Sequence, residues 1–244
     1  MGKPILPLIL LAAACAALHP ARAESGLTVM ADERRPHAWR ENGIPQGICY
    51  ELVVETMKEL KLKPEVEFTS FVRGLHLAQT EKNVAFFSVT PTPERDQLFK
   101  WVGPLVRSDV YIYKLRENPL TIRTLDDLRR QTKIGVPRGM KQDTTLSSEG
   151  YKVMRFDNIS KTLLALANRR TDVIAIGELT LHASAREVGL DPALFEQTPL
   201  KLYENPLYIA FSKDVSDETI QRWQKALDKV KREKYSQLDH KYLH

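Results

Sequence analysis

The sequence predicts an α/β protein of two units, in which mostly parallel sheets are flanked by helices and a ligand cleft lies between the units. Apolar runs of strand length alternate with stretches whose apolar residues recur every three or four positions, as in helices. This alternation predicts parallel strands joined by right-handed crossovers. It runs through about the first hundred residues and then begins again, and 244 residues are enough for two such units. A cleft between them collects the loops at the carboxyl ends of the strands.

The composition is that of an ordinary soluble globular protein, with 43% hydrophobic and 27% charged residues. Collagen-like, coiled-coil and wholly disordered chains are therefore excluded. The 36 Lys and Arg residues exceed the 31 Asp and Glu residues, which gives a net charge of +5. The excess is scattered, and no run of Lys or Arg is longer than two residues. We therefore expect no nucleic acid partner.

The N-terminus has the pattern of an export signal over residues 1–23. Lys3 precedes an apolar run at 4–18, and the Ala-Arg-Ala at 21–23 has the small residues that a signal peptidase reads. The run is shorter than the roughly 20 residues of a membrane-spanning helix. We expect cleavage after residue 23 and an exported protein. An uncleaved anchor and lipid attachment at Cys15 remain open as alternatives.

The elements of the first unit follow from periodicity. A polar, proline-containing loop reaches from the first strand to Gly47, and apolar residues at spacings of three and four follow it. Residues 84–89 are apolar without alternation, which is typical of a strand buried on both faces of a parallel sheet. We expect strands at 27–31, 66–68 and 84–89, and helices at 48–60 and 71–79.

The second unit repeats the alternation, and the chain ends on one more strand and a long helix. Four polar residues are candidate helix N-caps, namely Thr124, Asp143, Ser160 and Ser216. Each would begin a helix. We expect strands at 110–113, 133–136, 152–155, 172–176 and 207–211, and helices at 124–130, from 143, at 161–170, to about 187 and from 216.

Common catalytic signatures are absent from the sequence. It has no G-x-S-x-G elbow, no G-x-x-x-x-G-K phosphate loop and no H-E-x-x-H zinc motif. Cys49 is the one thiol left after removal of residues 1–23, and its apolar surroundings indicate a buried small hydrophobic side chain. We expect no metal, no cofactor and no enzymatic activity.

The most informative segment is Phe-Ser-Val-Thr-Pro-Thr-Pro-Glu-Arg at 87–95. It follows the buried strand and so lies where α/β proteins bind ligands. Ser88 and Thr90 have the same parity along the strand, and both carry hydroxyls. Arg95 has a planar fork of donors that fits a carboxylate. An arginine between two acidic residues is also typical of a solvated surface, so the motif alone leaves both interpretations open.

Four segments together resemble the bacterial extracellular solute-binding proteins of family 3, which are periplasmic binding proteins for polar amino acids. The segments are the loop into the first helix at 43–52, the motif at 88–95, Trp-Val-Gly-Pro-Leu at 101–105, and Ile-Gly-Val-Pro-Arg-Gly at 134–139. The resemblance covers 24–244. It implies a two-lobed periplasmic binding protein-like fold that closes over a small ligand. Lobe 1 would comprise 24–107 and 205–244, and lobe 2 would comprise 108–204.

The resemblance also implies ligand-binding residues, with Ser88, Thr90 and Arg95 holding a ligand carboxylate. In lobe 2, Gly139-Met140-Lys141 stands where the family usually has Gly-Thr-Thr, which removes a hydroxyl and adds a cation. Glu178 follows Gly177, where an Asp usually receives the ligand's ammonium group. The full set of expected binding residues is Glu33, Arg35, Trp39, Phe71, Ser88, Thr90, Arg95, Arg138, Gly139, Met140, Lys141 and Glu178.

The resemblance implies a monomeric protein that delivers an amino acid or an organic anion to an inner-membrane ABC permease. Arg35, Arg138 and Lys141 would favour an anion without an ammonium group, whereas Glu178 would favour an amino acid. Two alternatives remain. One is a periplasmic sensor subunit that docks on a receptor. The other is a cyclohexadienyl dehydratase-like enzyme in which Glu178 acts as a general acid.

Overall fold

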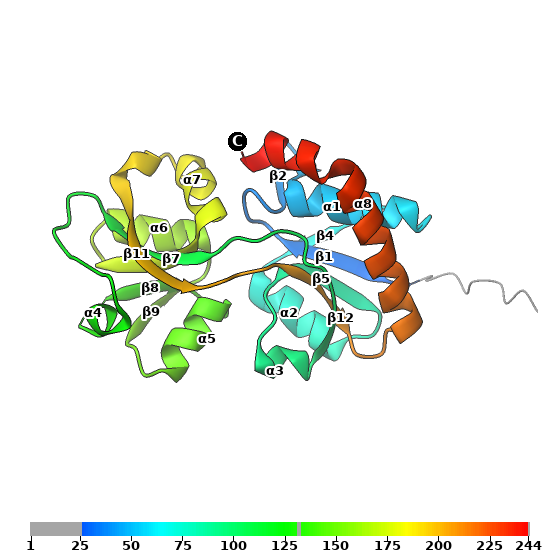
Figure 1. Cartoon of the computed structure of the whole chain (residues 1–244), viewed down its shortest axis with the longest axis horizontal. Helices are drawn as coiled ribbons and strands as arrows, with labels where there is room; N and C mark the ends of the chain where they lie inside the picture. The colour runs from blue at the N-terminus through cyan, green and yellow to red at the C-terminus, as the bar shows by residue number, and fades with distance from the viewer. Residues whose placement is uncertain (1–25, 131–132, 244) are drawn as a thin grey trace, which may run out of the picture.

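The computed structural model describes residues 26–130 and 133–243. The expected leader at 1–23 and Cys15 lie outside this part of the chain. Two α/β lobes lie side by side, and each is built on a five-stranded sheet (Figure 1). None of the helices in the described ranges combines the length and the hydrophobicity needed to cross a membrane.

The sheet of the first lobe has the order β4-β1-β5-β12-β6. Strand β1 (Thr28–Asp32) pairs in parallel with β4 (Glu67–Thr69) on one side and with β5 (Val84–Val89) on the other. Strand β12 (Tyr208–Ser212) is antiparallel to both β5 and β6 (Phe99–Val102). The last strand of the chain therefore completes the sheet that the first strands began.

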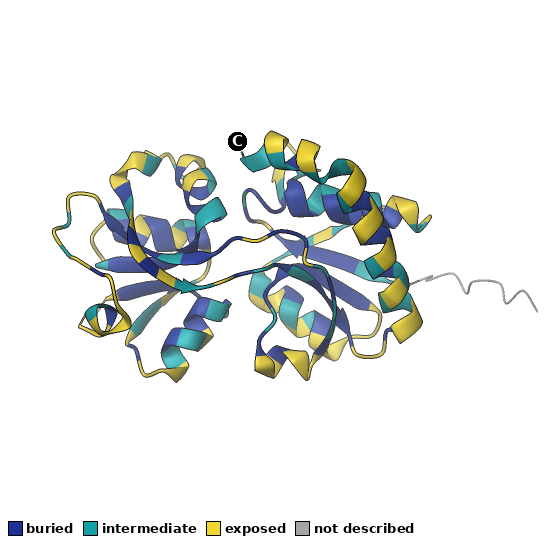
Figure 2. Cartoon of the chain, in the orientation of Figure 1, coloured by how far each residue is buried: buried dark blue, intermediate teal, exposed yellow. Residues whose placement is uncertain are grey.

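Helices cover both faces of the first sheet. Helices α1 (Ile48–Glu59) and α8 (Asp217–Leu243) pack on one face, where Trp223 is fully buried against Phe211. Helix α2 (Phe71–Thr80) packs on the other face. Figure 2 shows the central strands buried and the outer sides of the helices exposed, as amphipathic helices require.

The sheet of the second lobe has the order β11-β7-β10-β8-β9. The strands are β7 (Val110–Leu115), β8 (Ile134–Pro137), β9 (Val153–Phe156), β10 (Val173–Gly177) and β11 (Phe195–Tyr203). Pairing is parallel among β10, β8 and β9 and antiparallel from β10 through β7 to β11. Both sheets are thus mixed, with more antiparallel pairing than the sequence predicts, because β7, β11, β6 and β12 flank the connections between the lobes.

Alternate residues of β10 face the two sides of this sheet. Val173 and Ala175 pack with α4 (Leu125–Arg129) and α5 (Lys141–Ser148). Ile174 and Ile176 pack with α6 (Ile159–Ala167) and α7 (Glu178–Glu187). The strand is buried on both faces, which explains its continuous apolar sequence.

Two chain segments connect the lobes, and they run side by side (Figure 1). Leu105 donates its N–H to the carbonyl of Leu207 at 2.7 Å, and Ser108 donates to the carbonyl of Asn205 at 3.0 Å. Arg107 and Pro206 form an antiparallel bridge between these two bonds. We propose that this double strand is the hinge and that the lobe boundaries expected at 107–108 and 204–205 lie in it.

Several elements differ from the sequence predictions. The polar loop before Gly47 contains a short hairpin of β2 (Trp39–Glu41) and β3 (Ile44–Gln46), and the motif at 87–95 ends in a helical turn, α3 (Pro93–Asp96). Helix α6 begins two residues early, because Asn158 and not Ser160 accepts the N–H of Lys161 at 2.8 Å. Helix α5 follows Met140, so Asp143 lies inside it.

Candidate functional site

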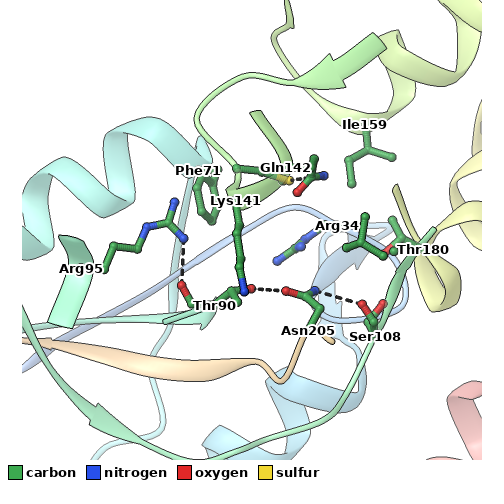
Figure 3. A pocket seen from close by; sticks show the side chains of 13 residues that line it. Arg34, Phe71, Thr90, Arg95, Ser108, Lys141, Gln142, Ile159, Thr180 and Asn205 are labelled. Atoms are coloured by element: carbon green, nitrogen blue, oxygen red, sulfur yellow. Dashed lines mark hydrogen bonds between the residues drawn. The ribbon is translucent and has the colours of Figure 1, made fainter. Parts of the chain in front are cut away.

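A small cavity lies between the lobes, at the carboxyl ends of the central strands (Figure 3). Its volume is about 20 Å³, which is room for about one water molecule. An adjoining cavity of about 430 Å³ shares Arg34, Phe71, Met140 and Ile159 with it. The small cavity is lined by Arg34, Phe71, Thr90, Arg95, Ser108, Val110, Met140, Lys141, Gln142, Ile159, Gly177, Thr180 and Asn205.

Arg95 reaches this cavity from α3, where Thr92 caps the helical turn by accepting the N–H of Arg95 at 3.3 Å. The side chain is 7% exposed. Its Nη1 donates to the carbonyl of Thr90 at 2.9 Å, and its Nη2 donates across the cleft to the carbonyl of Gly139 at 2.9 Å. No acidic side chain of the described chain lies within ion-pair distance of it, and burial lowers its pKa. Arg95 is therefore a buried cation without a counterion.

Strand β5 bulges at Ser88, because Phe87 and Val89 pair with the consecutive residues Ile209 and Tyr208. Ser88 has a φ of 63°, and such bulges redirect side chains. Within the described residues its buried hydroxyl has no hydrogen-bond partner, and Ser88 lines neither cavity. The parity argument that placed Ser88 and Thr90 on one side therefore fails at this residue.

The bulge positions Arg34 instead of Ser88 in the cavity. The carbonyl of Ser88 accepts a hydrogen bond from Nη2 of Arg34 at 2.8 Å. Arg34 also pairs with Asp32 at 3.3 Å, and both side chains are buried. Burial raises the pKa of Asp32, although the neighbouring guanidinium opposes this shift.

Lys141 enters the cavity from the second lobe, at the first residue of α5. Its Nζ lies 4.3 Å from the centre of the Tyr203 ring, and the side chain points toward Thr90 and Asn205 in Figure 3. Burial and the charge of Arg95 both lower the pKa of Lys141. The two lobes thus bring two unpaired cations, Arg95 and Lys141, to the same cavity.

Three helices of the second lobe begin at the cavity. Lys141 opens α5, Ile159 opens α6, and Gly177 precedes α7, whose first turn contains Thr180. Free backbone N–H groups and the helix dipole make such N-termini favourable for anions. The backbone therefore adds to the positive potential of the side chains.

The hinge supplies neutral polar groups to the cavity floor. Asn205 accepts a short hydrogen bond from the hydroxyl of Thr90 and donates to the carbonyl of Ser108 at 3.0 Å. Thr180 contacts Nε2 of the buried His37 at 3.3 Å, which links the two lobes. The hydroxyl of Ser108 has no hydrogen-bond partner in the part of the chain that the structure describes, and Ser108 is 1% exposed.

The structure brings five of the expected binding residues to the small cavity, namely Phe71, Thr90, Arg95, Met140 and Lys141. Gly139 meets Arg95 through its carbonyl. Glu33 and Arg138 line the adjoining cavity, where Glu33 pairs with Arg40 at 2.7 Å. Arg35 and Trp39 line a separate hollow against the end of α8, with the guanidinium of Arg35 stacked 4.7 Å from the indole centre.

Glu178 lines none of these three cavities. Its carboxylate accepts the backbone N–H of Asp109 at 3.3 Å, next to the hinge. Gly177 itself is tightly packed, since a Cβ there would lie 2.6 Å from the hydroxyl of Ser108. The carboxylate expected beside the ligand is therefore directed at the hinge backbone.

Sequence reasoning missed the hinge and loop residues of the cavity, above all Arg34, Ser108 and Asn205. The sequence could have indicated Ser108 and Asn205. Both are polar residues in the two segments that connect the lobes, and such segments lie at the floor of the cleft. Arg34 differs by one position from the expected Arg35. Arg34 is held at the cavity by Asp32 and by the carbonyl of Ser88, and the sequence does not reveal these contacts.

Metal and thiol chemistry find no support in the site. In the described ranges no three His, Cys, Asp or Glu side chains are grouped to hold a metal ion. Cys49 is buried, and burial raises the pKa of its thiol to about 12, so it is not a nucleophile at neutral pH.

Two lobes on a double hinge, with a polar cavity between them, define a two-lobed binding protein. Residues 27–244 match the model of the bacterial extracellular solute-binding proteins, family 3. The chain belongs to this family.

Solved structures share the fold at low identity. An arginine-binding protein mutant (P235GK) from T. maritima has a TM-score of 0.77 and 21% identity, covering 89% of this chain and 95% of that one. An ancestral arginine-binding protein bound to arginine has a TM-score of 0.77 and 24% identity over 91% and 100%. A histidine kinase sensor domain has a TM-score of 0.80 and 18% identity over 91% and 98%. No curated protein sequence matches this chain.

Proposed function

We propose that this protein is a periplasmic substrate-binding protein that captures a small carboxylate-bearing solute for an ABC-type importer. The observation that carries the proposal is Arg95, a buried guanidinium without a counterion between two lobes. A buried charge is costly unless a partner compensates it. A ligand carboxylate is such a partner, because it can accept two parallel hydrogen bonds from the fork.

Binding would proceed by closure of the lobes about the double hinge. Arg95 holds the carboxylate from the first lobe, while Lys141 and the start of α5 approach it from the second. Phe71 packs on Phe86 at 5.6 Å and presents its ring to both cavities, where it can cover the apolar part of a solute. Closure creates a surface that a permease can recognise. The monomeric state and the cleaved leader are part of the same proposal.

Isothermal calorimetry against a panel of L-amino acids and carboxylic acids tests the proposal. We expect saturable binding to wild type and a loss of about 100-fold or more in Arg95→Met, because two charge-assisted hydrogen bonds are removed. Arg123→Met is the matched control, since Arg123 is exposed in the second lobe and lines none of the described cavities. Equal affinity in both variants, or no binding across the panel, would contradict the proposal.

The same closure would serve a sensor subunit, and the sensor-domain neighbour shares the fold. Uptake of the bound solute into vesicles that hold the partner permease separates the two roles. A dehydratase activity finds no support in the position of Glu178, whose carboxylate is directed at the hinge and not at the cavity.

A further inference from the structure

The lining of the small cavity carries positive side chains and no acid. Arg34, Arg95 and Lys141 are the charged groups among its lining residues. Arg34 is balanced by Asp32 at 3.3 Å, which lines the adjoining cavity and not the small one. Arg95 and Lys141 have no ion pair with any described acidic side chain. The side chains that line the small cavity therefore have an excess of positive charge.

An ammonium group in this cavity would meet neutral oxygen acceptors and no carboxylate among the lining residues, and four of these neutral groups are already engaged in one hydrogen bond. The carbonyl of Thr90 accepts from Arg95 at 2.9 Å, and the amide oxygen of Asn205 accepts from Thr90. The amide oxygen of Gln142 accepts from the hydroxyl of Tyr203 at 2.9 Å. The hydroxyl of Thr180 is engaged with His37 at 3.3 Å.

Ser108 is the exception among the polar side chains of the lining. Ser108 lines the cavity, and its hydroxyl is buried and has no hydrogen-bond partner in the described chain. A hydroxyl can donate to a carboxylate as well as accept. Beside two unpaired cations it suits a carboxylate oxygen better than an ammonium group, because the cations repel the latter.

Gly177 is closely packed at the position where an acid could have offset these charges. A Cβ at Gly177 would lie 2.6 Å from the hydroxyl of Ser108, so a longer side chain there would require Ser108 to shift. Glu178 is held by the N–H of Asp109. Neither position therefore supplies a negative group to the lining of the small cavity.

We propose that the solute is a small carboxylic acid with no ammonium group beside its carboxylate. This rests on the proposed binding function and specifies its substrate class. The carboxylate lies between Arg95, Lys141 and Ser108. The rest of the solute extends past Phe71 into the adjoining cavity, which is lined by side chains of both charges.

Calorimetry with pairs of solutes that differ only in the α-ammonium group tests this directly. The pairs are succinate and L-aspartate, glutarate and L-glutamate, 4-methylpentanoate and L-leucine, and 5-guanidinopentanoate and L-arginine. We expect at least one pair in which the acid without the ammonium group binds tenfold or more tightly than its partner. We expect no pair in which the amino acid binds more tightly.

Two variants test the electrostatic cause. Lys141→Gln should reduce the preference within the binding pair severalfold, while Lys152→Gln, an exposed lysine of the same lobe, should leave it unchanged. Asn205→Asp places a near-isosteric negative charge at the cavity and should move the preference toward the amino acid. Thermal melts of each variant establish that it is folded. An unchanged preference in Lys141→Gln would overturn the electrostatic explanation.

The outcomes separate this inference from the function on which it rests. An amino acid that binds as tightly as its partner or more tightly overturns the inference and keeps the binding function. No binding by any member overturns both. Inorganic phosphate is included in the panel, and phosphate that binds more tightly than every carboxylate overturns the assignment of the head group.

Discussion

Arg95 shows at the scale of one residue how binding and stability oppose each other. Arg95 is 7% exposed, and within the described residues its guanidinium donates to the carbonyls of Thr90 and Gly139 and lies 5.7 Å from the centre of the Phe71 ring. Burying a cation costs several kcal/mol, and two neutral acceptors return only part of that. The proposed role of Arg95 in binding a carboxylate would account for a buried charge that adds little to the stability of the fold.

The first prediction concerns the stability of Arg95→Met. Met keeps much of the side-chain volume and removes the buried charge, so we expect the free energy of unfolding without added solute to stay within about 1 kcal/mol of wild type or to rise. Urea unfolding measures it. A loss of more than about 3 kcal/mol would show that Arg95 holds the lobes together and would contradict its assignment as a ligand group.

His37 gives a prediction for pH. It is 1% exposed, its Nε2 contacts Thr180 across the lobes, and burial with the nearby Arg34 lowers its pKa well below 6.5. The unfolded chain takes up the proton near pH 6.5 and the folded chain does so only at lower pH. The neutral His37 therefore makes its full contribution to the free energy of unfolding above about pH 6.5. Below that pH the contribution falls by up to about 1.4 kcal/mol per pH unit.

Urea unfolding at pH 7, 6 and 5 measures this effect. His37→Gln should flatten the decline between pH 7 and 5, whereas His76→Gln, an exposed histidine on α2, should decline as wild type does. A slope in His37→Gln identical to that of wild type would show that His37 is not the group responsible.

The sequence predicted those residues of the candidate site that belong to a recognisable motif. Thr90, Arg95 and Lys141 lie at strand ends and turns that the sequence marks, and all three line the cavity. Ser88 and Glu178 do not, because a bulge and a contact to Asp109 redirect them. Such choices depend on the tertiary packing and not on local residue type.

At the scale of elements, α2 shows a conflict between propensity and packing. Gly74 lies inside this helix, where Ala would be favoured by about 1 kcal/mol in an exposed peptide. A Cβ at this position would, however, lie 2.5 Å from the ring of Phe86. The close approach brings α2, and with it Phe71, onto the sheet beside the cleft.

We predict that Gly74→Ala destabilises the protein by about 1–3 kcal/mol, because overpacking outweighs helix propensity. Gln79→Ala, an exposed position of the same helix, should change stability by less than about 0.5 kcal/mol. Urea unfolding of the two variants measures the difference. A more stable Gly74→Ala protein would contradict the packing described for Phe86.

The long or fully buried elements were predictable from sequence, and of the four edge strands β4 and β9 were expected whereas β6 and β11 were not. Residues 84–89 form β5 as expected, since a continuous apolar run requires two covered faces. Strand β11 contains Pro199, a residue that is unfavourable in a strand interior. The structure tolerates Pro199 since β11 lies at the edge of its sheet and is irregular between Gln197 and Lys201.

At the scale of the whole molecule, two lobes meet directly through Arg95 and through His37 and are joined by the double hinge. Because few hydrogen bonds of this kind cross between the lobes in the described chain, opening of the cleft costs less free energy than unfolding of either lobe. We predict that saturating solute lowers the radius of gyration of the protein in solution. Small-angle scattering with and without the best solute of the calorimetric panel measures this, and an unchanged radius would argue against hinge closure.

Native mass spectrometry of freshly purified protein tests the central claim most directly. That claim is that Arg95 holds a small carboxylate solute between the lobes. We predict a noncovalent adduct of a small acid on wild type that is absent from Arg95→Met produced in the same cells. A protein that carries no solute, as purified or after incubation with the panel, or an adduct equally retained by Arg95→Met, would contradict it.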